Sequence, residues 1–424
     1  MNILLLGSGG RECTFAWKLA QSEHCDQLYI APGNAGTAHF GQNVDLSILD
    51  FESIARFCLD KDIRVLLPGS EDPLVAGIYD FFKTRKELKH IIVAGPSKAG
   101  AQLEGSKAFS KKFMQRYHIP TAAYKEFDDS NFEEGLAYLE ETPTPIVLKA
   151  DGLAAGKGVV ITEDRQEAKD TFRAMIKEAQ FGTAGKTVVV EQFLSGIELS
   201  VFVLTDGENF VVLPEAKDYK RIAEGDLGPN TGGMGAVSPV PFASPEFMKQ
   251  VLDDIVKPTI KGLQAEGITY QGFIFFGLIK VDNAPFVIEY NCRMGDPETE
   301  VVLPRLGNDL VNLFLQMDAG KLNEVKLEYN PNSACTVMLV SQGYPGAYEK
   351  GKLILGWEDT DGSYLFHAGT SQTPAGTVTN GGRVLAITSL APSLQEALKL
   401  SYDNAHKIQF EGKNYRQDIG YEFI

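Results

Sequence analysis

The sequence predicts an α/β protein of several domains, α+β in its centre, whose first hundred residues form an open parallel sheet. In that region the aliphatic runs NILLLG, QLYIAPG, RVLLPG and HIIVAGP each end at Gly or Pro, and ECTFAWKLAQS has helical periodicity. Strands that alternate with helices pair in parallel and bind ligands at their carboxyl ends. The chain has 424 residues, more than one hydrophobic core supports, so two to four domains are expected.

The remaining sequence mixes helical and strand patterns. The segment AGAQLEGSKAFSKKFMQRYHIP is expected to form one amphipathic helix that closes at Pro120. Two strand-rich segments, PIVLKADGLAAGKGVVIT and KTVVVEQFL, flank the helical DRQEAKDTFRAMIKEA. Residues 325–424 are rich in strands, with a late helix at SLQEALKLSYDNAHKI. Repeats and flexible linkers are absent from the sequence, so we expect tightly packed domains.

Composition narrows the possible partners. The net charge of −16 and the pI of about 4.9 argue against binding of nucleic acid, which requires a positive surface. The longest apolar runs, such as GFIFFGLIKV, are too short to cross a membrane, and the N-terminus lacks a signal-type run. Five scattered cysteines without a CxxC pair indicate reduced thiols. We therefore expect a cytoplasmic protein, monomeric, that binds neither nucleic acid nor membrane.

The opening loop GSGGREC resembles part of a dinucleotide fingerprint. Gly7 and Gly9 fit G-x-G-x-x-G, but Glu12 stands at the third glycine position. The second strand ends in APGN, without the carboxylate that would bind a ribose, so NAD is disfavoured. Two interpretations stay open: the amides of Gly9 and Gly10 hold a phosphate at a helix N-terminus, or the loop is a plain βα turn.

The segment KADGLAAGKG, residues 149–158, is a second glycine-rich element. It is not a Walker A loop, because three residues separate Gly152 from Gly156 and Gly158 follows Lys157. Strand patterns flank it on both sides. Such a hairpin can fold over a triphosphate through its amides and Lys157, while Lys149 on the preceding strand is aimed at a phosphate. A flexible surface hairpin is the alternative.

Residues 285–300, PFVIEYNCRMGDPETE, place polar groups at alternate positions of a strand. Glu289, Asn291 and Arg293 are therefore expected on one face, after Val287. A carboxylate and an amide oxygen side by side suit Mg²⁺, and the arginine suits a carboxylate or phosphate. A half-exposed edge strand would explain the same alternation.

Residues 215–239, EAKDYKRIAEGDLGPNTGGMGAVSP, contain five glycines and few apolar residues. The stretch is either a mobile functional loop or disordered. Lys217, Asp218, Lys220 and Arg221 just before the glycines supply charged groups.

Taken together, these stretches resemble the phosphoribosylamine–glycine ligase (glycinamide ribonucleotide synthetase) family of the ATP-grasp superfamily. The similarity continues through LEGSKAFSKKFM to the C-terminal FHAGT and YRQDIGYE and spans nearly the whole chain. It implies a Rossmann-like N-terminal domain at 1–102, a two-part ATP-grasp region at 103–325 with 121–192 as its mobile lid, and a small C-terminal domain at 326–424.

The resemblance also implies an activity. Enzymes of this family ligate glycine to 5-phosphoribosylamine with ATP and release ADP and phosphate, the second step of de novo purine biosynthesis. The reaction proceeds through glycyl phosphate, so the protein positions reactants and neutralises charge rather than offering a covalent nucleophile. ATP and Mg²⁺ or Mn²⁺ are the implied cofactors, and a transient contact with the preceding pathway enzyme is a further expectation.

Matching motifs imply roles for individual residues. Glu191 corresponds to the segment that holds adenine and Glu198 to the carboxylate that takes the ribose hydroxyls. The implied nucleotide ligands are Lys107, Lys149, Gly156, Lys157, Gly158, Glu191, Phe193, Leu194 and Glu198. Glu289 and Asn291 are the implied metal ligands, and Asp218 and Arg293 the implied catalytic residues. The implied substrate contacts are Gly9, Gly10, Lys220, Asn230, Thr231, Asp296 and Pro297.

The sequence departs from the family pattern at several positions. Cys13 stands where the family has His after GRE, and Tyr219 replaces the His of DHKR. These changes exclude an obligatory histidine base at either position. GPEAPL has become GSEDPL, with Ser70 and Asp72. Asp72 adds a negative charge near expected anionic ligands and is explained only if it pairs with a Lys or Arg.

Two other functions compete with the ligase. Another ATP-grasp enzyme, of the carboxylase or acyl-ligase kind, would differ in the N-terminal domain and the GPNTGGMG loop. A non-enzymatic nucleotide-binding regulator would lack Lys149, Glu289 or Asn291, and all three are present.

Overall fold

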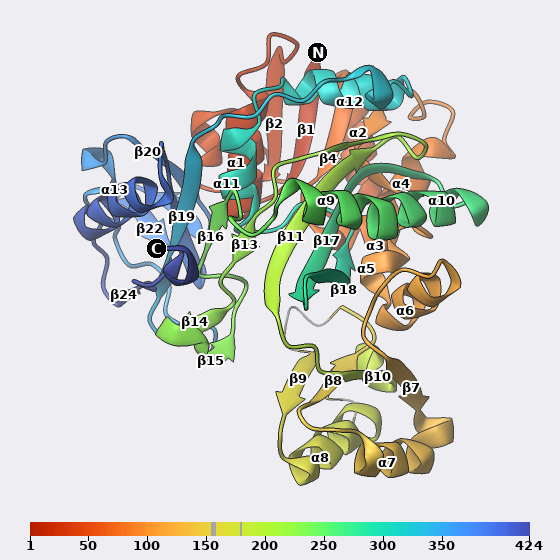
Figure 1. The fold of residues 1–424 in the computed structure, drawn as a ribbon. Helices are drawn as coiled ribbons and strands as arrows, with labels where there is room; N and C mark the ends of the chain where they lie inside the picture. The colour runs from red at the N-terminus through yellow and green to blue at the C-terminus, as the bar shows by residue number, and fades with distance from the viewer. Residues whose placement is uncertain (154–157, 179) are drawn as a thin grey trace.

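The N-terminal part of the protein is a five-stranded parallel sheet. The computed structural model describes residues 1–153, 158–178 and 180–424 (Figure 1). The sheet has the order β3-β2-β1-β4-β5. Its strands are β1 (Asn2–Gly7), β2 (Gln27–Pro32), β3 (Gln42–Asn43), β4 (Ile63–Pro68) and β5 (Ile92–Val93). The four aliphatic runs noted in the sequence thus form neighbouring parallel strands, as predicted.

Four helices belong to this part, of which the first three follow β1, β3 and β4. They are α1 (Gly10–Leu19), α2 (Phe51–Asp60), α3 (Glu71–Ala76) and α4 (Ile78–Lys83). Helix α1 is buried along most of its length because it contacts the later elements α11 (Thr299–Arg305) and β20 (Ser363–His367) as well as β1. The opening loop therefore lies at a junction of distant parts of the chain.

The prediction of one helix before Pro120 was wrong. The segment forms two helices, α5 (Gln102–Gly105) and α6 (Lys107–Arg116). Ser106 between them is extended, with φ −141° and ψ 115°, and its hydroxyl accepts a hydrogen bond from the Phe109 amide at 3.0 Å. Serine favours this capping position over a helix interior, so the chain starts a new helix there.

An antiparallel sheet with two helices projects at the bottom of Figure 1. Its order is β7-β10-β8-β9, with strands β7 (Tyr124–Asp128), β8 (Ile146–Ala150), β9 (Val159–Thr162) and β10 (Thr187–Gln192). Helices α7 (Phe132–Glu141) and α8 (Arg165–Ile176) cover it. Phe127, Leu148, Phe172 and Val190 form a core of its own, separate from those of the main body.

The central sheet has the order β12-β11-β17-β18. Its strands are β11 (Ile197–Thr205), β12 (Phe210–Val212), β17 (Tyr270–Val281) and β18 (Ala284–Asn291), and β6 (Gly95–Pro96) pairs with β17. Gly277 faces Glu289 while Leu278 faces Val287, so Ile288 is the extra residue of a β-bulge. The strict alternation expected through Val287 and Glu289 is therefore interrupted, a correction to the prediction.

A third sheet, mainly C-terminal, recruits two strands from the central sequence. Its path is β13-β16-β19-β23-β20, with β24 paired to β19. The strands are β13 (Lys217–Asp218), β16 (Gly235–Ser238), β19 (Ser333–Ser341), β20, β23 (Arg383–Ala391) and β24 (Lys413–Asn414). β14 (Arg221–Ala223) pairs with β15 (Leu227–Asn230), and β21 (Thr370–Thr373) with β22 (Gly376–Thr379). About half of the glycine-rich stretch 215–239 is thus paired in strands, whereas a mobile loop or disorder was expected; residues 231–234 remain a loop between β15 and β16.

The remaining helices cover these sheets. They are α9 (Pro245–Val251), α10 (Lys257–Ala265), α12 (Leu310–Asp318) and α13 (Leu394–Lys407), with a π-helical segment, η5 (Leu252–Val256), joining α9 to α10. Short 3₁₀ turns are η1 (Thr37–His39), η2 (Asp129–Asn131), η3 (Gly182–Lys186), η4 (Glu224–Asp226), η6 (Leu322–Glu324), η7 (Trp357–Asp359) and η8 (Tyr421–Phe423).

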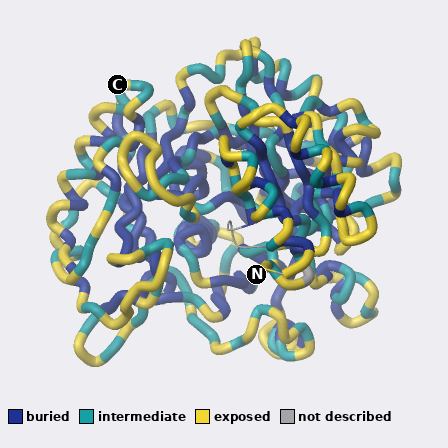
Figure 2. Tube along the Cα trace, turned by 90° about the horizontal axis from the view of Figure 1, so that it is seen from below, coloured by how far each residue is buried: buried dark blue, intermediate teal, exposed yellow. Residues whose placement is uncertain are grey.

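One large core joins the N-terminal and central sheets. Leu4 and Leu66 of the first sheet share it with Ile274 and Val287 of the second. Figure 2 shows buried backbone within the body and exposed backbone concentrated around its edges. Among the helices of the described ranges, none combines the length and apolarity needed to span a bilayer.

Candidate active site

A cavity of about 790 Å³ lies where the three later sheets and the N-terminal region meet. Most of the predicted site residues line it. These are Lys107, Lys149, Gly158, Glu191, Phe193, Leu194, Glu198, Asp218, Lys220, Asn230, Thr231, Glu289, Asn291, Arg293 and Asp296. Gly9, Gly10 and Pro297 are not among the described residues that line it. Gly156 and Lys157 lie outside the described residues.

One end of the cavity gathers lysines around a single buried carboxylate. Lys111 of α6 and Lys149 of β8 lie 3.1 and 3.0 Å from Glu191 Oε2. Lys107 is one helical turn before Lys111, and its Nζ donates to the Gly152 carbonyl at 3.2 Å. Lys107 and Lys111 face the cavity together because residues four apart share a helix face. Lys107, Lys111 and Lys149 thus bring three amines to this end of the cavity.

Burial shapes the ionisation of this cluster. It lowers the pKa of Lys111 to about 8, although the Glu191 carboxylate opposes the shift. Burial raises the pKa of Glu191, but Lys149 and Lys111 outweigh it and hold that pKa below its ordinary value. Oε1 of Glu191 is buried without a hydrogen-bond partner in the described part of the chain. The cluster thus offers cationic donors and one unused acceptor.

Acidic groups surround Lys220 further along the cavity. Its Nζ donates to Glu198 Oε2 at 2.7 Å. Burial lowers the pKa of Lys220, but Glu198 and Asp218 outweigh it and raise that pKa well above its ordinary value. Burial and the neighbouring Asp218 raise the pKa of Glu298 to about 7. Lys220 and Glu198, which were assigned to different ligands, therefore bind each other here.

Glu289 and Asn291 stand at the end of β18. Gly277 lies opposite Glu289, and a Cβ on Gly277 would approach Glu289 Cγ to 3.0 Å, so glycine leaves room for the carboxylate. Asn291 Oδ1 accepts from Arg293 Nη2 at 3.2 Å. No group of three or more His, Cys, Asp or Glu able to hold a metal occurs among the described residues. Two protein oxygens still fit Mg²⁺, which keeps waters and takes its other ligands from phosphates.

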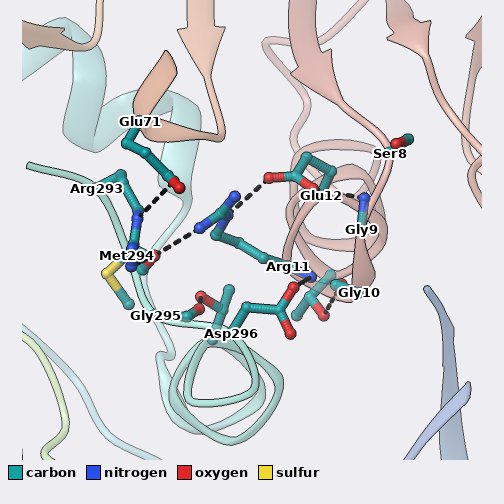
Figure 3. A network of polar contacts seen from close by, with 12 residues as sticks. Ser8, Gly9, Gly10, Arg11, Glu12, Glu71, Arg293, Met294, Gly295 and Asp296 are labelled. Carbon is teal, nitrogen blue, oxygen red and sulfur yellow. Dashed lines mark hydrogen bonds and ion pairs between the residues drawn. The ribbon is translucent and has the colours of Figure 1, made fainter. Parts of the chain in front are cut away.

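Arg293 and Arg11 lie side by side in a polar network that lines the cavity (Figure 3). Its Nε donates to Glu71 Oε2 at 3.2 Å and its Nη2 to Glu104 Oε1 at 2.8 Å. Arg11 lies beside it, donating from Nε to Glu12 Oε1 at 2.7 Å and from Nη1 to the Met294 carbonyl at 3.1 Å. Burial raises the pKa of Glu71, but Arg293 and Arg11 outweigh it and lower that pKa to about 2. Much of the hydrogen-bonding capacity of Arg293 is therefore used by protein carboxylates.

Carboxylates of the protein accept hydrogen bonds from backbone amides of the opening loop. The Gly9 amide donates to Glu12 Oε2 at 2.6 Å, and the Arg11 amide lies 3.3 Å from Asp296 Oδ2. The loop therefore contacts the segment 294–296, as Figure 3 shows. Phosphate binding by Gly9 and Gly10 stays a prediction.

Cys13 and Tyr219, which stand where the family has histidine, are buried and do not line the cavity. Cys13 packs among Met234, Met338 and Phe366, and burial raises the pKa of its thiol to about 12. The Tyr219 hydroxyl donates to Glu422 Oε2 at 2.7 Å. Cys13 therefore packs α1 against the central and C-terminal segments, and Tyr219 connects the central segment to the C-terminal one.

Asp72 remains unexplained. It is exposed on α3 and forms no ion pair with any described residue. The lysine or arginine partner that would have accounted for it is not found within the described ranges.

Sequence reasoning missed several residues that line the cavity. They are Arg11, Glu71, Glu104, Lys111, Glu298, Arg383 and Glu422. Helical spacing from Lys107 could have identified Lys111. Glu298 lies within a motif that was noted in the sequence. The other residues reach the cavity only through tertiary packing.

Three family models match most of the chain. The models for the N domain, the ATP-grasp (A) domain and the C domain of phosphoribosylglycinamide synthetase match residues 1–104, 105–299 and 334–422. The chain belongs to the phosphoribosylglycinamide synthetase family. The family predicted from the motifs is thereby confirmed.

Full-length relatives agree with this assignment. The phosphoribosylamine–glycine ligases of Vibrio cholerae and Haemophilus influenzae are each 46% identical over 429 aligned residues, which cover 100% of this chain and 99% of the relative. The crystal structure of the phosphoribosylamine–glycine ligase from Thermotoga maritima superposes with a TM-score of 0.85 at 35% identity, covering 99% of this chain and 100% of that one.

Structures of other ATP-grasp proteins share the fold alone. The biotin carboxylase domain of the Hydrogenobacter thermophilus 2-oxoglutarate carboxylase, in complex with MgADP, superposes with a TM-score of 0.72 at 19% identity. The superposition covers 97% of this chain and 91% of the carboxylase chain. The predicted fold class, α/β with an ATP-grasp centre and a strand-rich C-terminal part, is confirmed.

Proposed function

We propose that this chain ligates glycine to 5-phosphoribosylamine at the expense of ATP, forming glycinamide ribonucleotide, ADP and phosphate, the second step of purine biosynthesis. Membership of the family over nearly the full length supports this activity. The observation that carries the proposal is that the ATP-grasp lysines and the family motifs at 217–231 and 289–298 line one cavity.

The ATP-grasp fold implies use of ATP, and the lysine-rich end of the cavity suits a triphosphate. We assign Lys107 and Lys149 to phosphate oxygens, because both side chains line the cavity, Lys149 buried and Lys107 half-buried. The unused Oε1 of Glu191 is an acceptor suited to the adenine amino group. Phe193, Leu194 and Glu198 complete the assigned nucleotide contacts, and Gly156, Lys157 and Gly158 stay predicted as the lid.

Glu289 and Asn291 are the proposed ligands of Mg²⁺, or of Mn²⁺ in its place. Their oxygens line the cavity, as a site completed by phosphate ligands requires. When bound, the ion would neutralise charge on the phosphates during transfer. Arg293 Nη2 holds the amide of Asn291 with its oxygen accepting, which fixes the orientation of that side chain.

The chemistry requires positioning more than covalent catalysis. The glycine carboxylate attacks the γ-phosphorus of ATP, which releases ADP and gives glycyl phosphate. The amine nitrogen then attacks the acyl carbon, phosphate leaves, and the amine loses a proton. We assign Asp218, Lys220, Asn230, Thr231, Arg293 and Asp296 to the two substrates, while Gly9, Gly10 and Pro297 stay predicted contacts.

Release of ADP with phosphoribosylamine generated in situ tests this function. We expect ADP to appear only when glycine is supplied, with a stoichiometric amount of glycinamide ribonucleotide. Glycine-independent release of ADP would refute the ligase assignment. A biotin-dependent or other acyl-ligase activity would instead require a different acceptor.

Other expectations from the sequence stay predictions. They are a cytoplasmic location, a monomeric state and a transient contact with the enzyme that supplies the unstable amine.

A further inference from the structure

Two loops assigned to the substrates are connected by an arginine from β23. Arg383 Nη1 donates to the Gly232 carbonyl at 2.6 Å and to the Asp296 carbonyl at 2.7 Å. The same nitrogen lies 3.0 Å from Asp296 Oδ1, forming an ion pair. Because both hydrogens of Nη1 are directed at the two carbonyls, Oδ1 is held by charge and not by a directed hydrogen bond. One side chain thus holds residues 232 and 296, which are 64 positions apart.

The packing around Arg383 leaves little freedom for these loops. A Cβ on Gly232 would lie 2.9 Å from Arg383 Cζ, and one on Gly233 would lie 2.3 Å from Pro297 Cδ. Gly233 has φ +115°, a conformation that favours glycine. The backbone amide of Gly232 donates a hydrogen bond to the Tyr344 hydroxyl at 2.8 Å. Both peptide groups of Gly232 are therefore held by residues from the C-terminal part of the chain.

We propose that Arg383 is a positioning residue that holds the 230–233 loop and Asp296 in register at the substrate end of the cavity. The inference rests on the proposed function, because it needs these loops to contact glycine and the amine. Arg383 lines the cavity with Asn230, Thr231 and Asp296, whereas the lysines at the nucleotide end come from α6 and β8. Loss of Arg383 is therefore predicted to weaken the use of glycine and phosphoribosylamine without weakening nucleotide binding.

The test compares Arg383→Met with Arg383→Lys, using steady-state kinetics and calorimetric titration with MgADP. We expect Arg383→Met to raise the KM for glycine, for phosphoribosylamine or for both by about tenfold or more. The Kd of MgADP is expected to stay within about twofold of wild type. Arg383→Lys keeps the positive charge but loses the planar guanidinium with its several N–H donors. We therefore expect KM values between those of wild type and Arg383→Met. Lys352→Met, in an ion pair with Glu349 on the surface of the C-terminal part, is the matched control and should leave all values unchanged.

Several results would overturn the proposal. One is wild-type KM values for both substrates in Arg383→Met, and another is an equal loss of MgADP affinity, which would indicate a general structural defect. If Arg383→Met does not fold, Tyr344→Phe decides: it removes the hydroxyl that binds the Gly232 amide and should raise the same KM by about threefold. Wild-type KM values in that variant would also refute the inference. If the wild-type chain shows no glycine-dependent ADP release, the proposed function fails and this inference falls with it.

Discussion

Arg293, half-buried at the cavity wall, forms an ion pair with the buried Glu104, with Nη2 of the arginine 2.8 Å from Oε1 of the glutamate. The same guanidinium binds Glu71 at 3.2 Å. The residue that the sequence assigned to catalysis is thus also the counter-charge for two carboxylates from the N-terminal part of the chain. Its role in activity and its role in stability are therefore separable by experiment.

Arg293→Met is expected to lower the free energy of unfolding by about 3–5 kcal/mol, because it leaves the buried Glu104 and the half-buried Glu71 without their arginine. Urea unfolding at neutral pH measures this loss. The double variant Arg293→Met/Glu104→Gln should recover part of it, since the amide carries no charge. The matched control is Arg85→Met, which breaks the exposed pair with Glu52 and should cost less than about 1 kcal/mol. A loss as small as the control's in Arg293→Met would contradict the role of the ion pair.

Glu289→Ala tests the proposed metal site. Removal of a carboxylate ligand should reduce glycine-dependent turnover roughly 100-fold or more at ordinary Mg²⁺, while the unfolding transition stays near that of wild type. Steady-state assays over a range of Mg²⁺ concentrations, with urea unfolding in parallel, measure both effects. Asp282→Asn, at the exposed turn of the same β17–β18 hairpin, is the control. Wild-type turnover in Glu289→Ala would refute the metal assignment.

Because His367 is buried, we expect the free energy of unfolding to fall at acidic pH. Burial, with His39 nearby, lowers its pKa to about 4 from an ordinary value of 6.5. The unfolded chain therefore binds more protons between these values, so stability is fully present above pH 6.5 and is lost as the pH falls toward 4. At pH 4.5 the loss from this group is about 2–3 kcal/mol relative to pH 7.

His367→Asn should lose correspondingly less stability on acidification, as measured by urea unfolding at pH 7 and 4.5. His24→Asn changes an exposed histidine and should behave like wild type. The interpretation would fail if His367→Asn and wild type lost the same stability between the two pH values.

The cysteines differ in their accessibility to thiol reagents. Cys25 is half-buried, whereas Cys13, Cys58, Cys292 and Cys335 are buried. Burial also raises the pKa of Cys13 and Cys58 to about 12, which leaves little thiolate. We expect Ellman's reagent to modify one thiol per native chain at pH 8, and none in Cys25→Ser. Rapid modification of a second thiol in the native protein would show that a buried cysteine is accessible.

Local patterns in the sequence determined much of this protein. Aliphatic runs ended by Gly or Pro identified the parallel strands of the N-terminal sheet, since strand periodicity and chain reversal depend on neighbouring residues. The long motifs identified the family, and most of the site residues that they predicted line the cavity, including Lys149, Glu289 and Asn291. The break at Ser106 was also a local signal, a helix cap, but it was overlooked.

Only the tertiary structure decided how these parts meet. The pairing of β13 and β16 with the C-terminal sheet, the carboxylates that bind Arg293, and the contact of Arg383 with Gly232 all join residues far apart in the chain. Such contacts depend on how whole sheets and helices pack together. The sequence around each of the two residues therefore carries no pattern that would identify its partner. For the same reason the positions of Cys13 and Tyr219, unusual by motif, could be understood only once their buried neighbours were known.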